Sequence, residues 1–318
     1  MSGPRDRDGV LIAWGDRLFY PGSRTVRDRT PKLRDMARRQ RADAIRQRIE
    51  DTVVRRAPQV MVKVTGGGRG MKAIAAHFRY ISKNGRLEIE DDRGQTLQGK
   101  GALPALVDEW RYGGSFIGDE SPRREAFNIM LSMPRGTDPL SVQWAAREFA
   151  RMELTDHKYV MVLHDHQANP HVHISVRAES KHGKRLNPRK ADLHRWRETF
   201  AAKLRERGIE AEATRQATRG ATRNYPELWR MKAAEGGRLI KPRSSHRGGA
   251  ATVAGRVEAR SAWQAIAGAL SMSGDAGDRR LAEAIGRFTR DVAPVKERVP
   301  ASDLRDHRPG QSSSDRSR

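Results

Sequence analysis

Two short segments near the middle of the chain predict a β-hairpin with two chemically different faces. Residues 158–163 (KYVMVL) and 171–177 (HVHISVR) are rich in β-branched residues, and a loop with Asn169 and Pro170 separates them. In the second segment, polar and apolar residues alternate. Because successive side chains of a strand point to opposite faces, one face of this hairpin packs on a core and the other carries polar groups.

The rest of the sequence predicts an α+β fold around this hairpin, with a mainly antiparallel sheet and helices on one side. Short β-branched segments alternate with segments whose apolar residues recur at helical spacing. A Gly-rich turn at 66–70 separates the first strand from the first helix of this fold. The further strands are expected at 59–65, 87–90, 95–98 and 126–133, and the helices at 71–83, 104–112, 138–153 and 193–207.

The distribution of charged and apolar residues divides the chain into three segments. Residues 1–57 form a basic N-terminal extension, 58–236 the folded domain, and 237–318 a basic, partly disordered C-terminal tail. Within the extension a charged helix is expected at 32–56. It lacks a strong apolar stripe and is not expected to contribute to a core. The tail contains one or two short helices and is expected to be disordered from about Val299.

The charge of the chain points to a polyanionic partner. Its 318 residues include 62 Lys and Arg against 39 Asp and Glu, a net charge of +23. Nucleic acid is the most common partner for such a surplus. A membrane is the rival, but no apolar run reaches the roughly 18 residues of a spanning helix, so no membrane insertion is expected. The first residues lack the pattern of a secretory signal, which favours a cytoplasmic location.

The chain contains no cysteine. Disulfides, thiolate metal sites and cysteine nucleophiles are therefore excluded. A transition-metal site has to use histidines and carboxylates, and covalent catalysis has to use Ser, Thr, Tyr, Lys or a carboxylate.

Histidines gather on the polar face of the predicted hairpin. His171 and His173 are two residues apart on one strand, so both point to this face, and the loop can bring His164 back against them. Three imidazoles that meet at one point leave open positions on a metal, which is typical of a catalytic metal site. Asp165 and His166 lie in the loop, where they can orient a ligand or accept a proton. The alternative is a group of surface histidines in a basic protein.

One of the five tyrosines is the candidate nucleophile. Tyr80 lies in the segment HFRYISKNGR, among the basic residues His77, Arg79, Lys83 and Arg86. A phosphate group fits such surroundings, and a tyrosine hydroxyl beside a metal can attack it. The alternative is a half-buried tyrosine that packs on the sheet.

These two segments resemble known proteins. The pattern HDHQANPHVH resembles the metal motif of relaxases, the DNA-nicking enzymes of conjugative and mobilisable plasmids, within the histidine-hydrophobic-histidine endonucleases. The segment VMVKVTGGGRGMKAIAAHFRYISKNGRLEIE resembles the part of relaxases that carries the nucleophilic tyrosine, above all in those that export T-DNA. Weaker likeness runs through NIMLSMPRGTD and GIEAEATRQATRGATRNYPEL, so the resemblance covers 59–231.

The resemblance implies a role for each of these residues. Tyr80 is the nucleophile, and His164, His171 and His173 hold a divalent metal, Mg²⁺ or Mn²⁺. The implied reaction is site- and strand-specific nicking by transesterification, which leaves a 5′-phosphotyrosyl link and a free 3′-OH. The implied substrate is single-stranded or melted DNA at an origin of transfer. Accessory mobilisation proteins and a type IV secretion system, which exports the protein with its DNA, are the implied partners.

Two residues depart from the resemblance. Relaxases often have Asp where His166 stands and Asn where Arg177 stands. From the residues alone the metal stays open, because three histidines also suit zinc, nickel or cobalt. The basic residues expected to contact DNA are Arg69, Lys72, Arg79, Lys83 and Arg177.

Three other functions stay open at this point. A DNA-binding accessory protein with the same fold but no catalysis would have the same charge, and it would bind DNA without nicking it. A replication initiator of the same superfamily commonly carries its tyrosine after the histidines, whereas Tyr80 precedes them. An RNA or nucleotide hydrolase that activates water on a metal does not need Tyr80.

Overall fold

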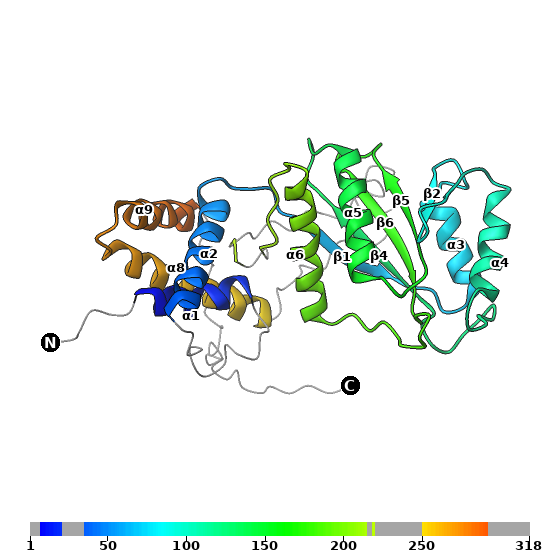
Figure 1. Cartoon of the computed structure of the whole chain (residues 1–318), viewed down its shortest axis with the longest axis horizontal. Coiled ribbons are helices and arrows are strands. Elements are labelled where there is room, and N and C mark those ends of the chain that lie inside the picture. The colour runs from blue at the N-terminus through cyan, green and yellow to red at the C-terminus, as the bar shows by residue number, and fades with distance from the viewer. Residues whose placement is uncertain (1–6, 21–34, 215–217, 220–249, 292–318) are drawn as a thin grey trace, which may run out of the picture.

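The computed structural model describes residues 7–20, 35–214, 218–219 and 250–291. In Figure 1 these residues form two groups, a sheet with its helices and a cluster of helices built from both flanks of the chain. The segment from Val299 that was expected to be disordered lies outside the described residues, as does Tyr225. None of the described helices is long and apolar enough to cross a membrane.

The sheet confirms the predicted α+β fold with antiparallel strands, but helices lie on both of its faces and not on one side as predicted. In the described part of the chain it has six antiparallel strands in the order β1-β4-β6-β5-β2-β3. The predicted hairpin is formed by β5 and β6, with Tyr159 opposite Val176 and His164 opposite His171. The strands are β1 (Met61–Gly66), β2 (Ile89–Asp91), β3 (Thr96–Leu97), β4 (Ala126–Ser132), β5 (Tyr159–His164) and β6 (His171–Arg177).

The two faces of the sheet are covered differently (Figure 1). α5 and α6 lie over the apolar face of the hairpin, where Val172 and Ile174 pack with Phe149 and Phe200 in the main core. α3 and α4 pack over the part of the opposite face formed by β5 and β2, where Phe78 belongs to a second core. The polar face of β6 is therefore only partly covered. The helices on the sheet are α3 (Met71–Ile81), α4 (Ala102–Tyr112), α5 (Pro139–Glu153) and α6 (Lys190–Glu206).

The ends of α3 are fixed by backbone conformations that the sequence predicts. Gly70 precedes the helix with a φ of 92°, and a Cβ there would lie 2.3 Å from the carbonyl oxygen of Asp119. Only glycine fits such a position. After the helix, Lys83, Asn84 and Gly85 all have positive φ values, 50°, 59° and 82°. This turn ends α3 at Ile81, two residues before the predicted end at 83, and leaves the last turn of the helix at the edge of the polar face.

The flanks form a second core. We call α1, α2, α8 and α9 together the flanking helix cluster. Its interior is formed by Leu11 of α1, Ile45 and Ile49 of α2, and Trp263 and Ile266 of α8, all buried. These helices are α1 (Arg7–Phe19), α2 (Asp35–Val53), α8 (Ala250–Ser271) and α9 (Ala276–Asp291).

The expectation that residues 32–56 do not contribute to a core was therefore wrong. Their apolar residues are few and lie among arginines, so the stripe is narrow, but Ala42, Ile45, Ile49 and Val53 follow one another at helical spacing and all four are buried. A narrow stripe is enough here because α1 covers it together with α9, which comes from the other end of the chain. The boundaries predicted at 57 and 236 remain a prediction.

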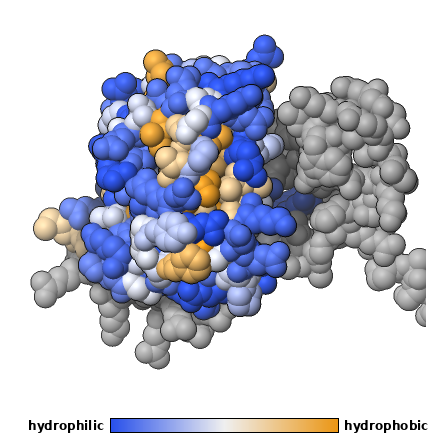
Figure 2. Space-filling view, turned by 90° about the vertical axis from the view of Figure 1, so that its right-hand side faces the viewer, coloured by the Kyte–Doolittle hydropathy of each residue, from blue (hydrophilic) through white to orange (hydrophobic). Residues whose placement is uncertain are grey.

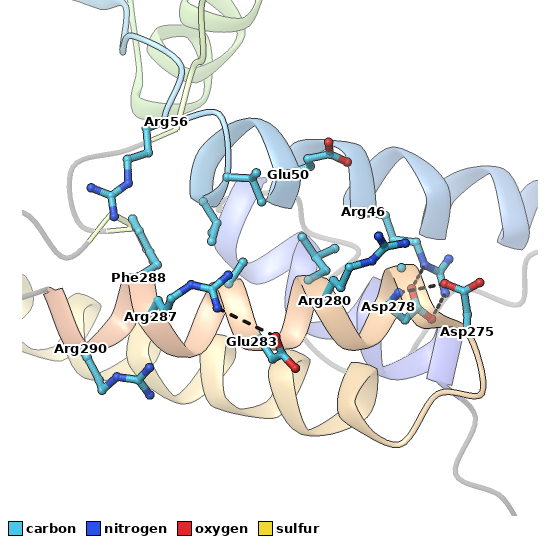
Figure 3. A pocket seen from close by; sticks show the side chains of 15 residues that line it. Arg46, Glu50, Arg56, Asp275, Asp278, Arg280, Glu283, Arg287, Phe288 and Arg290 are labelled. Atoms are coloured by element: carbon cyan, nitrogen blue, oxygen red, sulfur yellow. Dashed lines mark hydrogen bonds and ion pairs between the residues drawn. The ribbon is translucent and has the colours of Figure 1, made fainter.

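Ion pairs hold the flanking helix cluster together as well. Arg46 of α2 donates to Asp278 of α9 at 2.9 Å and to Asp8 of α1 at 3.0 Å. Figure 3 shows Arg46 and Asp278 at one end of the hollow between α2 and α9. One arginine thus links three helices that are far apart in the sequence.

A buried arginine joins the flanking helix cluster to the sheet domain. Arg48 of α2 donates to Glu212 at 3.1 Å and contacts Glu198 of α6. Glu212 is 3% exposed, and its backbone pairs with Pro58 and Val60 just before β1. A buried carboxylate of this kind depends on its cation, because its own hydration has been lost.

We expect Arg48→Met to lower the free energy of unfolding by about 3 kcal/mol, since removing one partner leaves a buried charge without its counterion. Thermal and urea unfolding, followed by circular dichroism, measure the change. Arg39→Met is the matched control, because Arg39 is an exposed arginine on the same helix. Equal stability of the two variants would contradict the structural role of Arg48.

Candidate active site

The structure brings the three predicted metal ligands together at one end of the hairpin. His164 is the register partner of His171, and His173 lies next along the same face of β6. The ring centroids are 5.0 Å apart for His164 and His171, 4.7 Å for His164 and His173, and 5.0 Å for His171 and His173. One nitrogen from each ring lies within 4.8 Å of the others. This arrangement suits one ion held by three imidazoles.

Backbone carbonyl groups orient two of these rings. Nε2 of His164 donates to the carbonyl oxygen of Ile81 at 2.7 Å, and Nδ1 of His171 donates to that of Asn169 at 2.9 Å. A carbonyl oxygen only accepts, so the opposite nitrogen of each ring keeps its lone pair. Among the described residues, Nδ1 of His164 and Nδ1 of His173 are buried without a hydrogen-bond partner. Buried polar atoms without a partner are costly, and a metal ion would satisfy such a lone pair.

Burial keeps these imidazoles neutral. It lowers the pKa of His164 and of His171, and it lowers the pKa of His173 to about 3, with further contributions from the neighbouring histidines. Only the neutral form of a histidine binds a metal. The site is therefore ready to bind a cation at neutral pH without first losing protons.

We expect the affinity for Mn²⁺ to change little between about pH 7.5 and about pH 6, although an ordinary histidine gains its proton near pH 6.5. Protonation competes with the metal only below the pKa of each ligand, and all three pKa values are lowered. Calorimetric titrations at several pH values measure this. A steep loss of affinity centred near pH 6.5 would show that the histidines titrate like exposed ones.

Tyr80 lies beside the histidine cluster. It is in the last turn of α3, the turn whose Ile81 carbonyl binds His164. The Tyr80 ring centroid is 6.4 Å from that of His173, and the side chain is 69% exposed. The predicted nucleophile therefore borders the cluster and faces solvent. The alternative of a half-buried tyrosine packed on the sheet does not apply to it.

The other described tyrosines lie elsewhere. Tyr159 is buried in the main core on the opposite face of the sheet, and Tyr20 packs in the flanking helix cluster. Tyr112 is exposed at the end of α4, where its ring lies 5.8 Å from that of Phe116. Among the described residues, only Tyr80 has its ring recorded beside a histidine of the cluster.

The surroundings of His77 differ from those that the sequence indicates. His77 is one of the basic residues near Tyr80 in the sequence, but burial lowers its pKa to about 4, so it is neutral at pH 7. Its ring stacks on that of Tyr80 at 6.1 Å and meets that of His173 edge-on at 6.4 Å. The available signal was its position three residues before Tyr80, which places both side chains on one flank of the helix.

Comparison with protein families identifies this part of the chain. Residues 117–209 match the family model described as "Relaxase: MobA/VirD2-like, nuclease domain". This part of the chain is similar to relaxase nuclease domains. The matched residues contain β4 to α6 and thus all three histidines of the cluster, whereas Tyr80 precedes them. No curated protein matches the chain.

Within the matched residues, Asp165 and His166 lie at the rim of the cluster. The His166 ring is 5.2 Å from that of His164, and its Nδ1 lies 4.0 Å from a carboxylate oxygen of Asp165. The Asp165 side chain is mostly exposed. Both residues are within reach of a substrate that enters from solvent, and neither belongs to the group of three converging nitrogens.

The predicted DNA contacts divide into two groups. Arg69, Lys72, Arg79 and Lys83 are exposed on or next to α3, so their contacts with DNA stay a prediction. The prediction for Arg177 does not hold. Its guanidinium group is buried, donates to the carbonyl oxygen of Trp110 at 2.6 Å, and also contacts the carbonyl of Ser115. Arg177 joins the end of β6 to the loop after α4 and is not free for a phosphate.

Proposed function

We propose that this relaxase domain nicks DNA by transesterification, with Tyr80 as the nucleophile. The observation that supports this most is the position of Tyr80, exposed and with its ring 6.4 Å from that of His173. A nucleophile has to be accessible to the phosphate while the residues that bind the phosphate stay close to it. A hydrolase that activates water would need the histidines but not an exposed tyrosine beside them.

In the proposed reaction the Tyr80 oxygen attacks the scissile phosphorus. A bond forms between this oxygen and phosphorus, and the bond from phosphorus to the 3′ oxygen breaks. The phenolic proton passes to a base, and the leaving oxygen takes up a proton to become a free 3′-OH. The products are a 5′-phosphotyrosyl link and the 3′-OH, and the reverse step rejoins the strand.

The residues around Tyr80 prepare this step. His164, His171 and His173 would hold a divalent metal, Mg²⁺ or Mn²⁺, which supplies positive charge for a non-bridging phosphate oxygen. Neutral His77 stacks on Tyr80 and fixes the side of α3 from which the hydroxyl reaches the phosphate. His166 and Asp165, at the rim, are the groups that we propose as acceptors of the phenolic proton.

We also propose the setting of this reaction. The substrate would be one strand of an origin of transfer, single-stranded or locally melted, during conjugative mobilisation of a plasmid. Accessory mobilisation proteins and a type IV secretion system would be the partners. The protein would act in the cytoplasm and leave the cell with its DNA. The family match and the net charge of +23 support this setting.

The test uses a random-sequence library of single-stranded DNA with Mn²⁺. DNA that stays on the protein after denaturation is sequenced, and the enriched sequence is resynthesised in single-stranded form and as a linear duplex. We expect covalent adduct with the single strand and little with the duplex, because unstacking a duplex costs a few kcal/mol per step. Gel electrophoresis measures both.

The outcomes separate the competing functions. DNA binding without adduct from any sequence would favour an accessory protein with the same fold. Equal cleavage of single strand and linear duplex would favour a general metal nuclease. An adduct on a tyrosine other than Tyr80, identified by mass spectrometry, would place the nucleophile elsewhere, as in replication initiators.

A further inference from the structure

A second hollow lies on the far side of the helix that carries Tyr80. It is a cavity of about 550 Å³ between α3 and α4. Ala75 of α3 and Leu103, Pro104 and Val107 of α4 form an apolar floor. Figure 2 faces the end of the molecule where these two helices lie and shows hydrophobic residues in the middle of a hydrophilic surface. We call this cavity the α3–α4 pocket.

The rim of the α3–α4 pocket is positively charged. Arg79, Arg86 and Lys100 line it together with one carboxylate, Asp108. All three cationic side chains are exposed, and they make no ion pair or hydrogen bond with another residue that the structure describes. By contrast, the surface arginine Arg93 is paired with Glu109 of α4. Three cations without partners around an apolar floor fit an anionic ligand that also has a flat apolar part.

The α3–α4 pocket is next to the active site across a single helix. Arg79 and Tyr80 are neighbours in the chain, but the helical rotation of about 100° per residue turns their side chains to different flanks. Tyr80 lies with His77 beside the histidine cluster, and Arg79 lies with Ala75 in the pocket. Asn84, in the turn that ends α3, also lines the pocket. A strand bound at Tyr80 reaches the pocket by crossing the end of α3, a width of about 10 Å.

We propose that the α3–α4 pocket binds a nucleotide of the DNA strand a short distance from the scissile phosphate. One base lies on the floor formed by Ala75, Leu103 and Val107, and the phosphates on either side of it contact Arg86 and Lys100. The inference rests on the proposed function, because DNA at Tyr80 is what brings a strand to this pocket. Only an unpaired base can enter, so the pocket selects single-stranded DNA.

The first test removes the charges of the rim. The variant Arg86→Gln with Lys100→Gln is compared with Arg151→Gln with Lys203→Gln, which changes the net charge equally on the helices of the opposite face. The ligand is a long fluorescent oligothymidylate. We expect roughly tenfold weaker binding for the pocket variant only. The slope of log affinity against log salt concentration should also be less steep by about 1.4, because each of the two lost phosphate contacts contributes about 0.7 to this slope.

The second test uses the absence of cysteine from the chain. Val107→Cys places one thiol in the α3–α4 pocket, and Met152→Cys places one on the exposed side of α5 as a control. The oligothymidylate carries one base whose thiol is protected as a mixed disulfide. The cysteine thiolate exchanges with it and releases the small protecting thiol, and this is fast only where that base rests beside the cysteine. We expect efficient cross-linking of Val107→Cys and background cross-linking of Met152→Cys.

The outcomes keep this inference apart from the proposed function. The inference would be overturned if the Arg86→Gln, Lys100→Gln variant bound DNA as tightly as its control and Val107→Cys cross-linked no better than Met152→Cys. If the protein still formed its adduct at Tyr80, the proposed function would be unaffected. Weaker oligothymidylate binding by the pocket variant together with specific cross-linking would support nucleotide binding in the α3–α4 pocket. If no DNA sequence gave an adduct at Tyr80, the proposed nicking function would nevertheless be ruled out. Unchanged oligothymidylate binding with lost binding of polyglutamate would assign the pocket to an acidic peptide and overturn the inference.

Discussion

Tyr80→Phe is expected to abolish the covalent adduct and to slow nicking by several orders of magnitude, as the loss of a catalytic nucleophile does. The substitution removes one oxygen atom from a side chain that is 69% exposed, so it leaves the packing of α3 unchanged. Affinity for single-stranded DNA should stay nearly the same, because many phosphate contacts share the binding energy. Denaturing gels measure the adduct, and fluorescence anisotropy measures the affinity.

Tyr112→Phe is the matched control for this experiment. Tyr112 is also exposed, at 67%, but it ends α4 and has no recorded ring contact with the histidine cluster. Its loss should leave adduct formation unchanged. Adduct formation by Tyr80→Phe at the rate of the unchanged protein would rule out Tyr80 as the nucleophile.

Replacement of His164, His171 or His173 by Ala is expected to weaken Mn²⁺ binding by more than about 100-fold, since even the loss of a partner outside the ligand shell costs 10- to 100-fold. Nicking should fall with the metal affinity, because each variant leaves only two imidazoles of the group. Calorimetric titration measures the affinity, and single-turnover nicking at saturating Mn²⁺ measures the rate.

Two other histidines are the controls. His166→Ala should reduce metal affinity less than the other three, because its ring lies at the rim of the cluster. His182→Ala should change nothing, because His182 is exposed in the loop after β6, beside Asp156. If His166→Ala abolished binding while His173→Ala retained it, the metal would be held by a different group of residues.

Most of the active-site geometry could be predicted from the sequence because it depends on local rules. Strand parity places His171 and His173 on one face, and a short loop returns His164 to it. The Gly-rich turn and the stop after Ile81 set the length of α3. The position of Tyr80 beside the cluster needed the resemblance to relaxases, since no local pattern says where a helix lies on a sheet.

What could not be predicted depends on contacts between distant segments. The narrow apolar stripe of α2 is buried because α1 packs against it and α9 returns to it from the other end of the chain. In the sequence His77 lies among basic residues, but burial in the folded protein lowers its pKa and keeps it neutral. Arg177 looked free on the polar face, but the loop after α4 closes over its guanidinium group. In each case the sequence gives the type of side chain, but the residues that surround it come from distant parts of the chain.

The hydrogen bonds that orient His164 and His171 have a consequence for how this site tolerates mutation. Both acceptors are backbone carbonyl groups, of Ile81 and Asn169. A point substitution at either position changes the side chain and leaves the acceptor in place. The tautomers of the two imidazoles therefore depend on the backbone conformation and not on the side chains at these two positions. Substitutions around the histidines can therefore leave their orientation unchanged. An insertion or deletion in the last turn of α3 or in the hairpin loop would displace Tyr80 and the three histidines together.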